Sequence, residues 1–223
     1  MRRSVEQILM KLHDFTTTML GPLAVSALLL PLSGSLQAQS AIRYEAQPGS
    51  KVRVDGTSTL HDWLVESKLI GGYIEFDPAF NPEKPAPGKV NARVAVIIPV
   101  RQLKSDKTAM DNVMYDAMKE KDHRRIDYRL SEMTLKEAPN APDAPLVFDT
   151  SGELIVAGVT NKIRMPVTMT RVDKDKFKFT GSTSVKMTSF GIQPPTKLGL
   201  FSTGDEVKLT FEWLTAKKEP APK

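Results

Sequence analysis

The sequence predicts an all-β protein: a single antiparallel barrel of about eight strands with one short amphipathic helix. Apolar and polar side chains alternate along many short runs, turn-forming residues separate these runs, and only one segment has helical spacing. Alternation gives each strand one dry face and one wet face, which is typical of antiparallel sheets. Parallel strands, in contrast, tend to be apolar throughout.

The expected strands cover most of the chain after residue 42. In residues 94–100, for example, Val94, Val96 and Ile98 share one face with Val100. Turns are expected at residues 71–72, 78–88 and 139–142, which are rich in glycine or proline. Eight to ten strands follow from this pattern, namely residues 43–45, 51–55, 59–69, 73–76, 94–100, 126–130, 146–156, 164–170, 176–179 and 207–213.

Residues 108–121 break the alternation, because Met110, Met114 and Met118 fall at helical spacing between charged residues. We expect a short amphipathic helix between two strands. A methionine stripe is flexible and tolerates varied apolar partners, so this helix is a candidate guard of the barrel mouth, together with the proline-rich loops. The alternative is that the stripe only seals one end of the core.

The N-terminus has the pattern of a secretory signal. Basic residues precede an uncharged apolar stretch at 19–32, and small and polar residues follow as far as Ala38. This stretch is shorter than the roughly twenty apolar residues that a membrane-spanning helix needs, although an uncleaved anchor is the alternative. The expected organisation is a signal peptide at 1–38, a barrel domain at 39–216 and a disordered tail at 217–223.

Composition excludes several classes of function. The chain has no cysteine, which rules out disulfides and cysteine-ligated zinc. Its net charge is +5, with 31 basic and 26 acidic residues interspersed along the sequence. Because nucleic-acid binding is expected to show a basic stripe, we expect no nucleic-acid partner.

The sequence offers little for catalysis. After residue 38 the only histidines are His61 and His123, and neither stands in a recognised catalytic or metal-binding motif. His61 and Asp62 are adjacent, so in a strand they would face opposite ways and could not form a buried dyad. We therefore expect no catalytic residue, no metal ligand and no cofactor.

A barrel of about eight strands either fills its interior with side chains or holds one small ligand. Only 7% of residues are aromatic, which favours a cavity. The candidate ligand-binding residues are the expected inward-facing side chains, the methionine stripe and one turn residue: Trp63, Phe76, Val96, Met110, Met114, Met118, Tyr128, Phe148, Leu154, Phe179, Phe190, Leu209 and Phe211.

Three motifs resemble those of the YceI-like family. Residues 56–63 (GTSTLHDW) are similar to its first-strand signature, residues 152–162 (GELIVAGVTNK) to its G-x-L-x-x-x-G-V-T hairpin, and residues 189–192 (SFGI) to its turn. The resemblance covers residues 42–215. It implies a lipocalin-like eight-stranded barrel, exported to the bacterial periplasm, that holds a long polyisoprenoid in an apolar lumen.

The sequence is therefore interpreted as a periplasmic carrier for an isoprenoid-like lipid, with the extracellular space as the alternative location. It is expected not to be an enzyme and not to insert stably into a membrane after loss of its signal. A ligand-free structural or interaction module is the main alternative, and a hydrolase or isomerase using His61 or His123 is a further one. The oligomeric state stays open, a homodimer included.

Export is directly testable. We expect a mature N-terminus near Gln39, because the small and polar residues that follow the apolar stretch are typical of a cleavage site. The intact mass of the protein from the envelope fraction measures this. A cytoplasmic chain that retains residues 1–38 would contradict the prediction.

Overall fold

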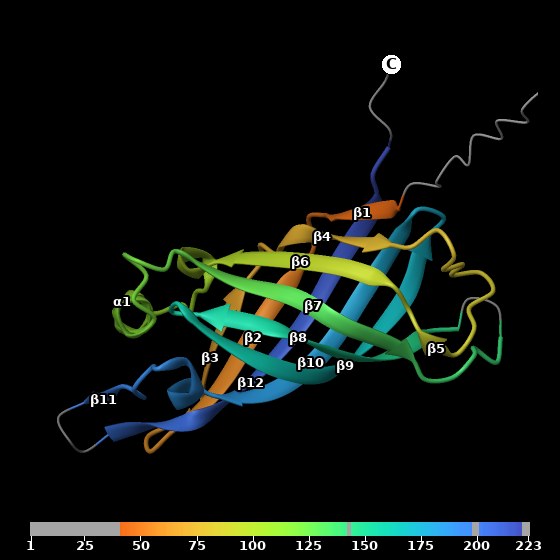
Figure 1. Cartoon of the computed structure of the whole chain (residues 1–223). Coiled ribbons are helices and arrows are strands. Elements are labelled where there is room, and N and C mark those ends of the chain that lie inside the picture. The colour runs from red at the N-terminus through yellow and green to blue at the C-terminus, as the bar shows by residue number, and fades with distance from the viewer. Residues whose placement is uncertain (1–40, 142–143, 198–200, 220–223) are drawn as a thin grey trace, which may run out of the picture. The chain divides into compact units, whose positions relative to one another are not determined.

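A computed structural model describes residues 41–141, 144–197 and 201–219, and the expected signal peptide at 1–38 lies outside them. Figure 1 shows these residues as antiparallel strands wound into a barrel. The elements are β1 Ile42–Ala46, β2 Lys51–Ser58, β3 Trp63–Ser67, β4 Gly71–Phe76, β5 Gly88–Lys89, β6 Ala92–Pro99, the 3-10 helix η1 Val100–Gln102, α1 Thr108–Ala117, β7 Arg125–Leu135, β8 Leu146–Val156, β9 Val159–Asp173, β10 Lys176–Lys186, the 3-10 helix η2 Met187–Phe190, β11 Thr196–Lys197 and β12 Phe201–Lys217.

The barrel closes through its first strand, β1. Eight strands pair in the order β1-β4-β6-β7-β8-β9-β10-β12, and β12 pairs back onto β1. Tyr44 marks the closure, because its register partners are Ile74 in β4 and Lys217 in β12. All of these pairings are antiparallel, so the predicted fold class is confirmed.

The hairpin of β2 and β3 adds to this ring. β2 pairs with β12 along residues that β1 does not reach. Glu66 of β3 exchanges two backbone hydrogen bonds of 2.9 Å with Lys104, which follows η1. The hairpin is thereby tied to the segment that leads from β6 into α1.

Several strands are longer or shorter than predicted, and two of the differences have a clear local cause. β3 begins only at Trp63, because the Ser58 hydroxyl accepts hydrogen bonds from the backbone N–H groups of Leu60 and His61 and forms a hairpin tip. β12 continues through Lys217, where the tail was expected to begin, and the backbone N–H of Lys218 still donates to Arg43 at 2.8 Å. Residues 220–223 lie outside the described part.

Helix α1 lies between β6 and β7, as predicted, but ends at Ala117 because Lys119 adopts a positive φ of 54°. Polar contacts fix its buried side. The Asp111 carboxylate accepts hydrogen bonds from the hydroxyl and backbone N–H of Ser105 at 2.7 and 2.8 Å. The Tyr115 hydroxyl donates to the carbonyl of Leu103 at 2.8 Å. No helix in the described ranges is long and apolar enough to cross a membrane.

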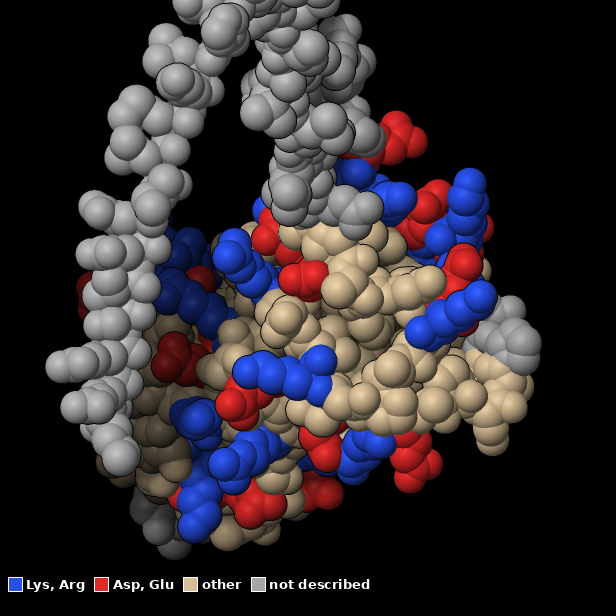
Figure 2. All heavy atoms as spheres, turned by 45° about the vertical axis from the view of Figure 1, so that its right-hand side comes forward, with Lys and Arg blue, Asp and Glu red and all other residues tan. Residues whose placement is uncertain are grey.

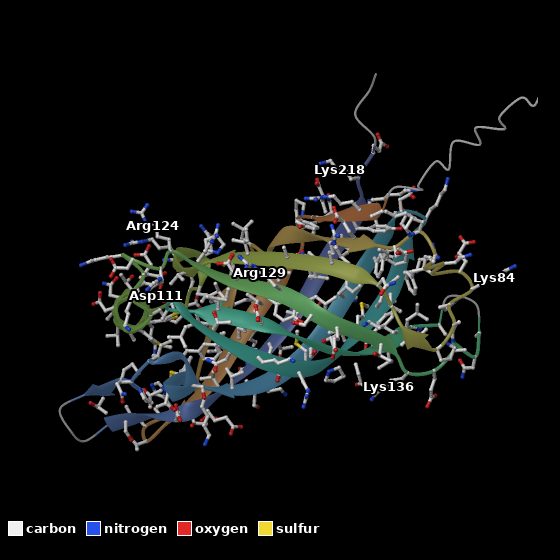
Figure 3. The ribbon with its side chains drawn as sticks, in the orientation of Figure 1. Lys84, Asp111, Arg124, Arg129, Lys136 and Lys218 are labelled. Atoms are coloured by element: carbon white, nitrogen blue, oxygen red, sulfur yellow. The ribbon has the colours of Figure 1, made fainter. Side chains whose placement is uncertain are left out.

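The two ends of the barrel carry different elements. Helix α1, η2 and β11 lie at one end in Figure 1, and the loops that flank β5 lie at the other. Figure 3 shows the same division, with Asp111 and Arg124 at the α1 end and Lys84 and Lys136 at the opposite end. On the face shown in Figure 2, basic and acidic side chains are interspersed, in keeping with the scattered charges of the sequence.

Candidate ligand-binding lumen

The barrel encloses a cavity of about 120 Å³, here called the lumen. Its wall is almost wholly apolar, and its polar members are Tyr128, Thr150, Thr183 and the indole of Trp213. The full lining is Val52, Ile70, Ile74, Val94, Val96, Ile98, Tyr128, Leu130, Met133, Thr150, Leu154, Ile163, Met165, Val167, Phe179, Thr183, Leu209, Phe211 and Trp213.

A solid aromatic cluster closes the lumen at the end opposite α1; we call it the base. Phe76 stacks on Phe80 with ring centroids 4.7 Å apart, and Phe80 meets the edge of Phe148 at 6.3 Å. Tyr44 packs against Phe177 at 5.1 Å. Such ring pairs contribute stability beyond the area they bury. The base is therefore packed core.

This finding corrects one expectation about the proline-rich loops. Residues 78–88 were expected to guard the mouth, but they carry Phe80 into the base instead. Lys136, which directly follows β7 and precedes the expected turn at 139–142, lies at that same end. The reason is the direction of the strands: β6 separates residues 78–88 from α1, and β7 separates α1 from the connection to β8, so both connections lie at the end opposite α1.

The lumen opens toward α1, and this end is called the mouth. Along β9, the inward-facing Val167 is buried, whereas Met165 and Ile163 nearer the mouth are half-buried. Along β7, Met133 is buried and Tyr128 is half-buried. On β7 and β9, the exposure of the inward side chains therefore rises toward the α1 end.

Two glycines let bulky rings lie flat against the wall of the lumen. A Cβ on Gly152 would stand 2.5 Å from the Tyr128 hydroxyl oxygen and equally close to the backbone carbonyl oxygen of Arg129. A Cβ on Gly181, which pairs with Phe211 across the strands, would stand 2.8 Å from Cε1 of that ring. Any larger residue would push these rings off the wall. The cavity depends on these two contacts.

The hydroxyl groups of the lumen are already partnered. Thr150 donates to the carbonyl of Met165 at 2.8 Å, and Thr183 donates to the carbonyl of Arg164 at 3.3 Å. Burial raises the pKa of Tyr128, and a hydrogen bond with Thr150 partly offsets this rise. The phenol is uncharged at neutral pH, so the lumen presents no ionised side chain within the described residues.

The structure places the candidate residues of the sequence in distinct regions. Phe76 and Phe148 belong to the base, and Phe190 is buried in a small cluster beside the mouth. Trp63 lies near the tip of the β2–β3 hairpin, with its ring over Gly56. The candidates that line the lumen are Val96, Tyr128, Leu154, Phe179, Leu209 and Phe211.

The methionine stripe lies on and just after α1. Met110, Met114 and Met118 are half-buried and pack against the core, whereas the helix residues Asp111 and Tyr115 are buried. Polar contacts hold the helix through its other side, so the methionine side chains are the flexible part of this packing. They do not line the lumen itself.

Other lumen residues were missed by the sequence reasoning, although most carried a signal. Ile98 alternates with the chosen Val96, and Trp213 follows the chosen Leu209 and Phe211 on one face. Val167 lies in the expected strand 164–170, from which no candidate was chosen. Thr150 and Thr183 gave no signal, because polar inward residues look like outward ones in a hydrophobic pattern.

The histidines have local roles. His61 is exposed at the β2–β3 tip, with Nδ1 3.0 Å from the carbonyl oxygen of Asp62. His123 packs beside Gly158, where an added Cβ would stand 2.5 Å from Cε1 of its ring. Gly158 and Ala157 both have positive φ and form the two-residue turn between β8 and β9. Across the described ranges, no three metal-ligating side chains gather into a possible metal site.

A second, larger hollow of about 440 Å³ lies on the surface at the end of α1. Charged and polar side chains line it, including Arg101 and Glu120, which form an ion pair of 2.9 Å. Acidic and basic groups are mixed in this hollow, so it selects no ligand charge. The apolar lumen is the better candidate site.

A closed antiparallel barrel with a packed base and an apolar lumen defines this protein as a lipocalin-like barrel. The chain belongs to the YceI-like family, whose domain profile matches residues 40–214. Of the expected family motifs, residues 152–162 form the β8–β9 hairpin, and residues 189–192 form a turn with Gly191 at φ 66°. Residues 56–63 span the end of β2 and the start of β3 instead of the first strand.

Solved structures share the fold at low sequence identity. BcnA of Burkholderia cenocepacia is 17% identical, with a TM-score of 0.56 over 74% of this chain and 95% of its own. A polyisoprenoid-binding domain from Saccharophagus degradans is 9% identical, with a TM-score of 0.60 over 80% of this chain and 100% of its own. A Campylobacter jejuni YceI protein is 18% identical, with a TM-score of 0.50 over 69% and 84%. No curated protein sequence matches this chain significantly.

The contact between Gly181 and Phe211 gives a test of the lumen geometry. We expect Gly181→Ala to lower the free energy of unfolding by about 1–3 kcal/mol, because the new methyl group displaces the ring into the lumen. The double variant Gly181→Ala/Phe211→Leu should cost less than the sum of the two single variants. Urea denaturation measures all four proteins, and strictly additive losses would contradict the contact.

Proposed function

We propose that this chain is an exported binding protein of the bacterial periplasm that holds a polyisoprenoid or similar long apolar lipid in its lumen. The observation that carries the proposal is the almost wholly apolar lumen, with its base closed by aromatic rings and its mouth open toward α1. The family and the polyisoprenoid-binding domain with the same fold support this choice of ligand. The N-terminal basic and apolar pattern supports export.

The size of the lumen limits how much of a lipid it can hold. A cavity of about 120 Å³ is close to an apolar cavity of about 150 Å³ that binds benzene in another protein, so it takes only part of a long chain. The rest of the lipid extends to the mouth, where Met110, Met114 and Met118 pack loosely against the core. Their side chains move aside at low cost, because methionine is unbranched and polarizable.

Binding strength then follows from chain length. Each buried methylene group contributes about 0.8 kcal/mol before the costs of ordering the chain. A wall with no ionised group offers little to a charged headgroup, so a longer apolar chain is favoured over a more polar one.

A binding role is favoured over catalysis. Neither His61 nor His123 lies in the lumen, and each has a local structural contact instead. The lining hydroxyls of Thr150 and Thr183 donate to backbone carbonyls, which leaves them without a base to activate them. The lumen therefore lacks the activated catalytic groups that a hydrolase or isomerase would need.

The proposed function is tested with two neighbouring variants on opposite faces of β9. Met165 faces the lumen, whereas Arg164 is exposed on the outside. Delipidated wild type, Met165→Gln and Arg164→Gln are each mixed with phosphatidylcholine vesicles that carry radiolabelled geranylgeraniol. We expect wild type and Arg164→Gln to take up the label equally. Met165→Gln should take up several-fold less, because it places an amide of similar volume in an apolar wall.

Thermal unfolding of the same proteins supplies the control. Met165 is half-buried, so its variant should melt within a few degrees of wild type and the uptake loss should reflect binding. Absence of uptake by wild type, or equal uptake by Met165→Gln, would contradict the lumen as the binding site. Absence of uptake would favour the ligand-free structural module.

A further inference from the structure

The indole of Trp213 is a buried hydrogen-bond donor without a partner. Its Nε1 has no hydrogen bond to any described residue, and the side chain is only 3% exposed. The other tryptophan follows the usual rule, since Nε1 of Trp63 donates to the carbonyl of Thr57 at 3.0 Å. Buried tryptophan N–H groups nearly always find an acceptor, because an unmade hydrogen bond costs the hydration that the group has lost.

Trp213 stands at the inner limit of the lumen. It lies on β12, which runs beside β10 in Figure 1, and its register partner is Phe179. Leu209 and Phe211, nearer the mouth on the same face, are half-buried, whereas Trp213 is buried. The next inward residue, Thr215, pairs with Phe177, whose ring belongs to the base.

Among the described residues, no acceptor lies within hydrogen-bond distance of this indole nitrogen. Phe179 packs against it with ring centroids 5.7 Å apart, and Phe211, two residues along the same face of β12, also lines the lumen. Thr183 pairs with Leu209, four residues along β12, which is about 13 Å away along the strand. The next hydroxyl along this face of β12 belongs to Thr215, and it donates to the carbonyl of Phe177 at 3.2 Å.

The absence of charged side chains in the lumen limits which ligand groups can accept a hydrogen bond from the indole. No lysine or arginine appears among the described residues that line it. A phosphate or carboxylate placed beside Trp213 would be a buried anion with one neutral donor, which is strongly unfavourable. An uncharged oxygen, such as a carbonyl, accepts the indole hydrogen bond without that cost.

We propose that Trp213 Nε1 is the donor that recognises an uncharged oxygen, of the carbonyl type, carried by the lipid in the lumen. This inference rests on the proposed lipid-binding function and adds the orientation of the ligand. The oxygen enters first and lies near the base, and the hydrocarbon chain extends past Phe211 and Leu209 to the mouth. Trp213 is thus a specificity residue: it makes the lumen bind oxygenated lipids more tightly than hydrocarbons of the same shape.

Two saturated isoprenoids test the donor. Phytone is a methyl ketone, and pristane has the same branched skeleton with a methyl group in place of the carbonyl oxygen. We expect wild type to bind phytone about tenfold more tightly than pristane, which is the effect of one buried hydrogen bond. Trp213→Phe should reduce the preference below twofold, because it keeps the apolar ring and removes the N–H. Trp63→Phe, which alters the tryptophan already bonded to Thr57, should keep the preference.

The NMR signals of the indole N–H groups provide a second test, which does not depend on the stability of a variant. The chain has 2 tryptophans, so a ¹⁵N-labelled protein shows an indole N–H signal for each. Phytone should move the Trp213 signal downfield, and pristane should leave its hydrogen-bonded shift unchanged. Equal affinities for the two ligands, with no downfield shift for phytone, would overturn the role of Trp213 while leaving the lipid-binding function intact. Failure of both ligands to bind would overturn the proposed function as well.

Discussion

A small barrel keeps a cavity only when its bulky inward side chains lie along the wall and not across the interior. Here that constraint is met by contacts between rings and glycines on neighbouring strands, Tyr128 over Gly152 and Phe211 over Gly181. Each glycine gives up the packing that a side chain would add to its strand. In return, the two rings stay against the wall and do not fill the lumen.

The two ends of the barrel differ: the base provides stable packing, and the mouth provides access to the lumen. At the base, Phe76, Phe80 and Phe148 pack as a solid core beneath the closure by β1. At the mouth, α1 is held by the polar contacts of Asp111 and Tyr115, which leaves its methionines only half-buried against the core. Stability thus resides where no ligand enters, and the more adaptable packing lies where a long chain would pass.

The alternation of the sequence was enough to predict the fold, the helix between β6 and β7, and several lumen residues. The loop at 78–88 was nevertheless placed at the wrong end, although one long strand, β6, separates it from α1 and consecutive antiparallel strands put such connections at opposite ends. Ring-to-glycine contacts need the cross-strand register, which a single sequence does not contain. Thr150 and Thr183 could not be predicted as lumen residues, because a polar inward side chain does not differ from an outward one in a hydrophobic pattern. That Trp213 Nε1 lacks a hydrogen-bond partner can be seen only in the three-dimensional structure.

Whether the lumen holds a lipid in the cell can be measured by native mass spectrometry of protein isolated from its own envelope. We expect a mass above that of the chain from Gln39 by one long isoprenoid lipid, released intact on denaturation and uncharged at its oxygen. Wild-type protein that carries no lipid, from envelopes where such lipids are abundant, would rule out a lipid-binding lumen. It would show that the interior serves only as core.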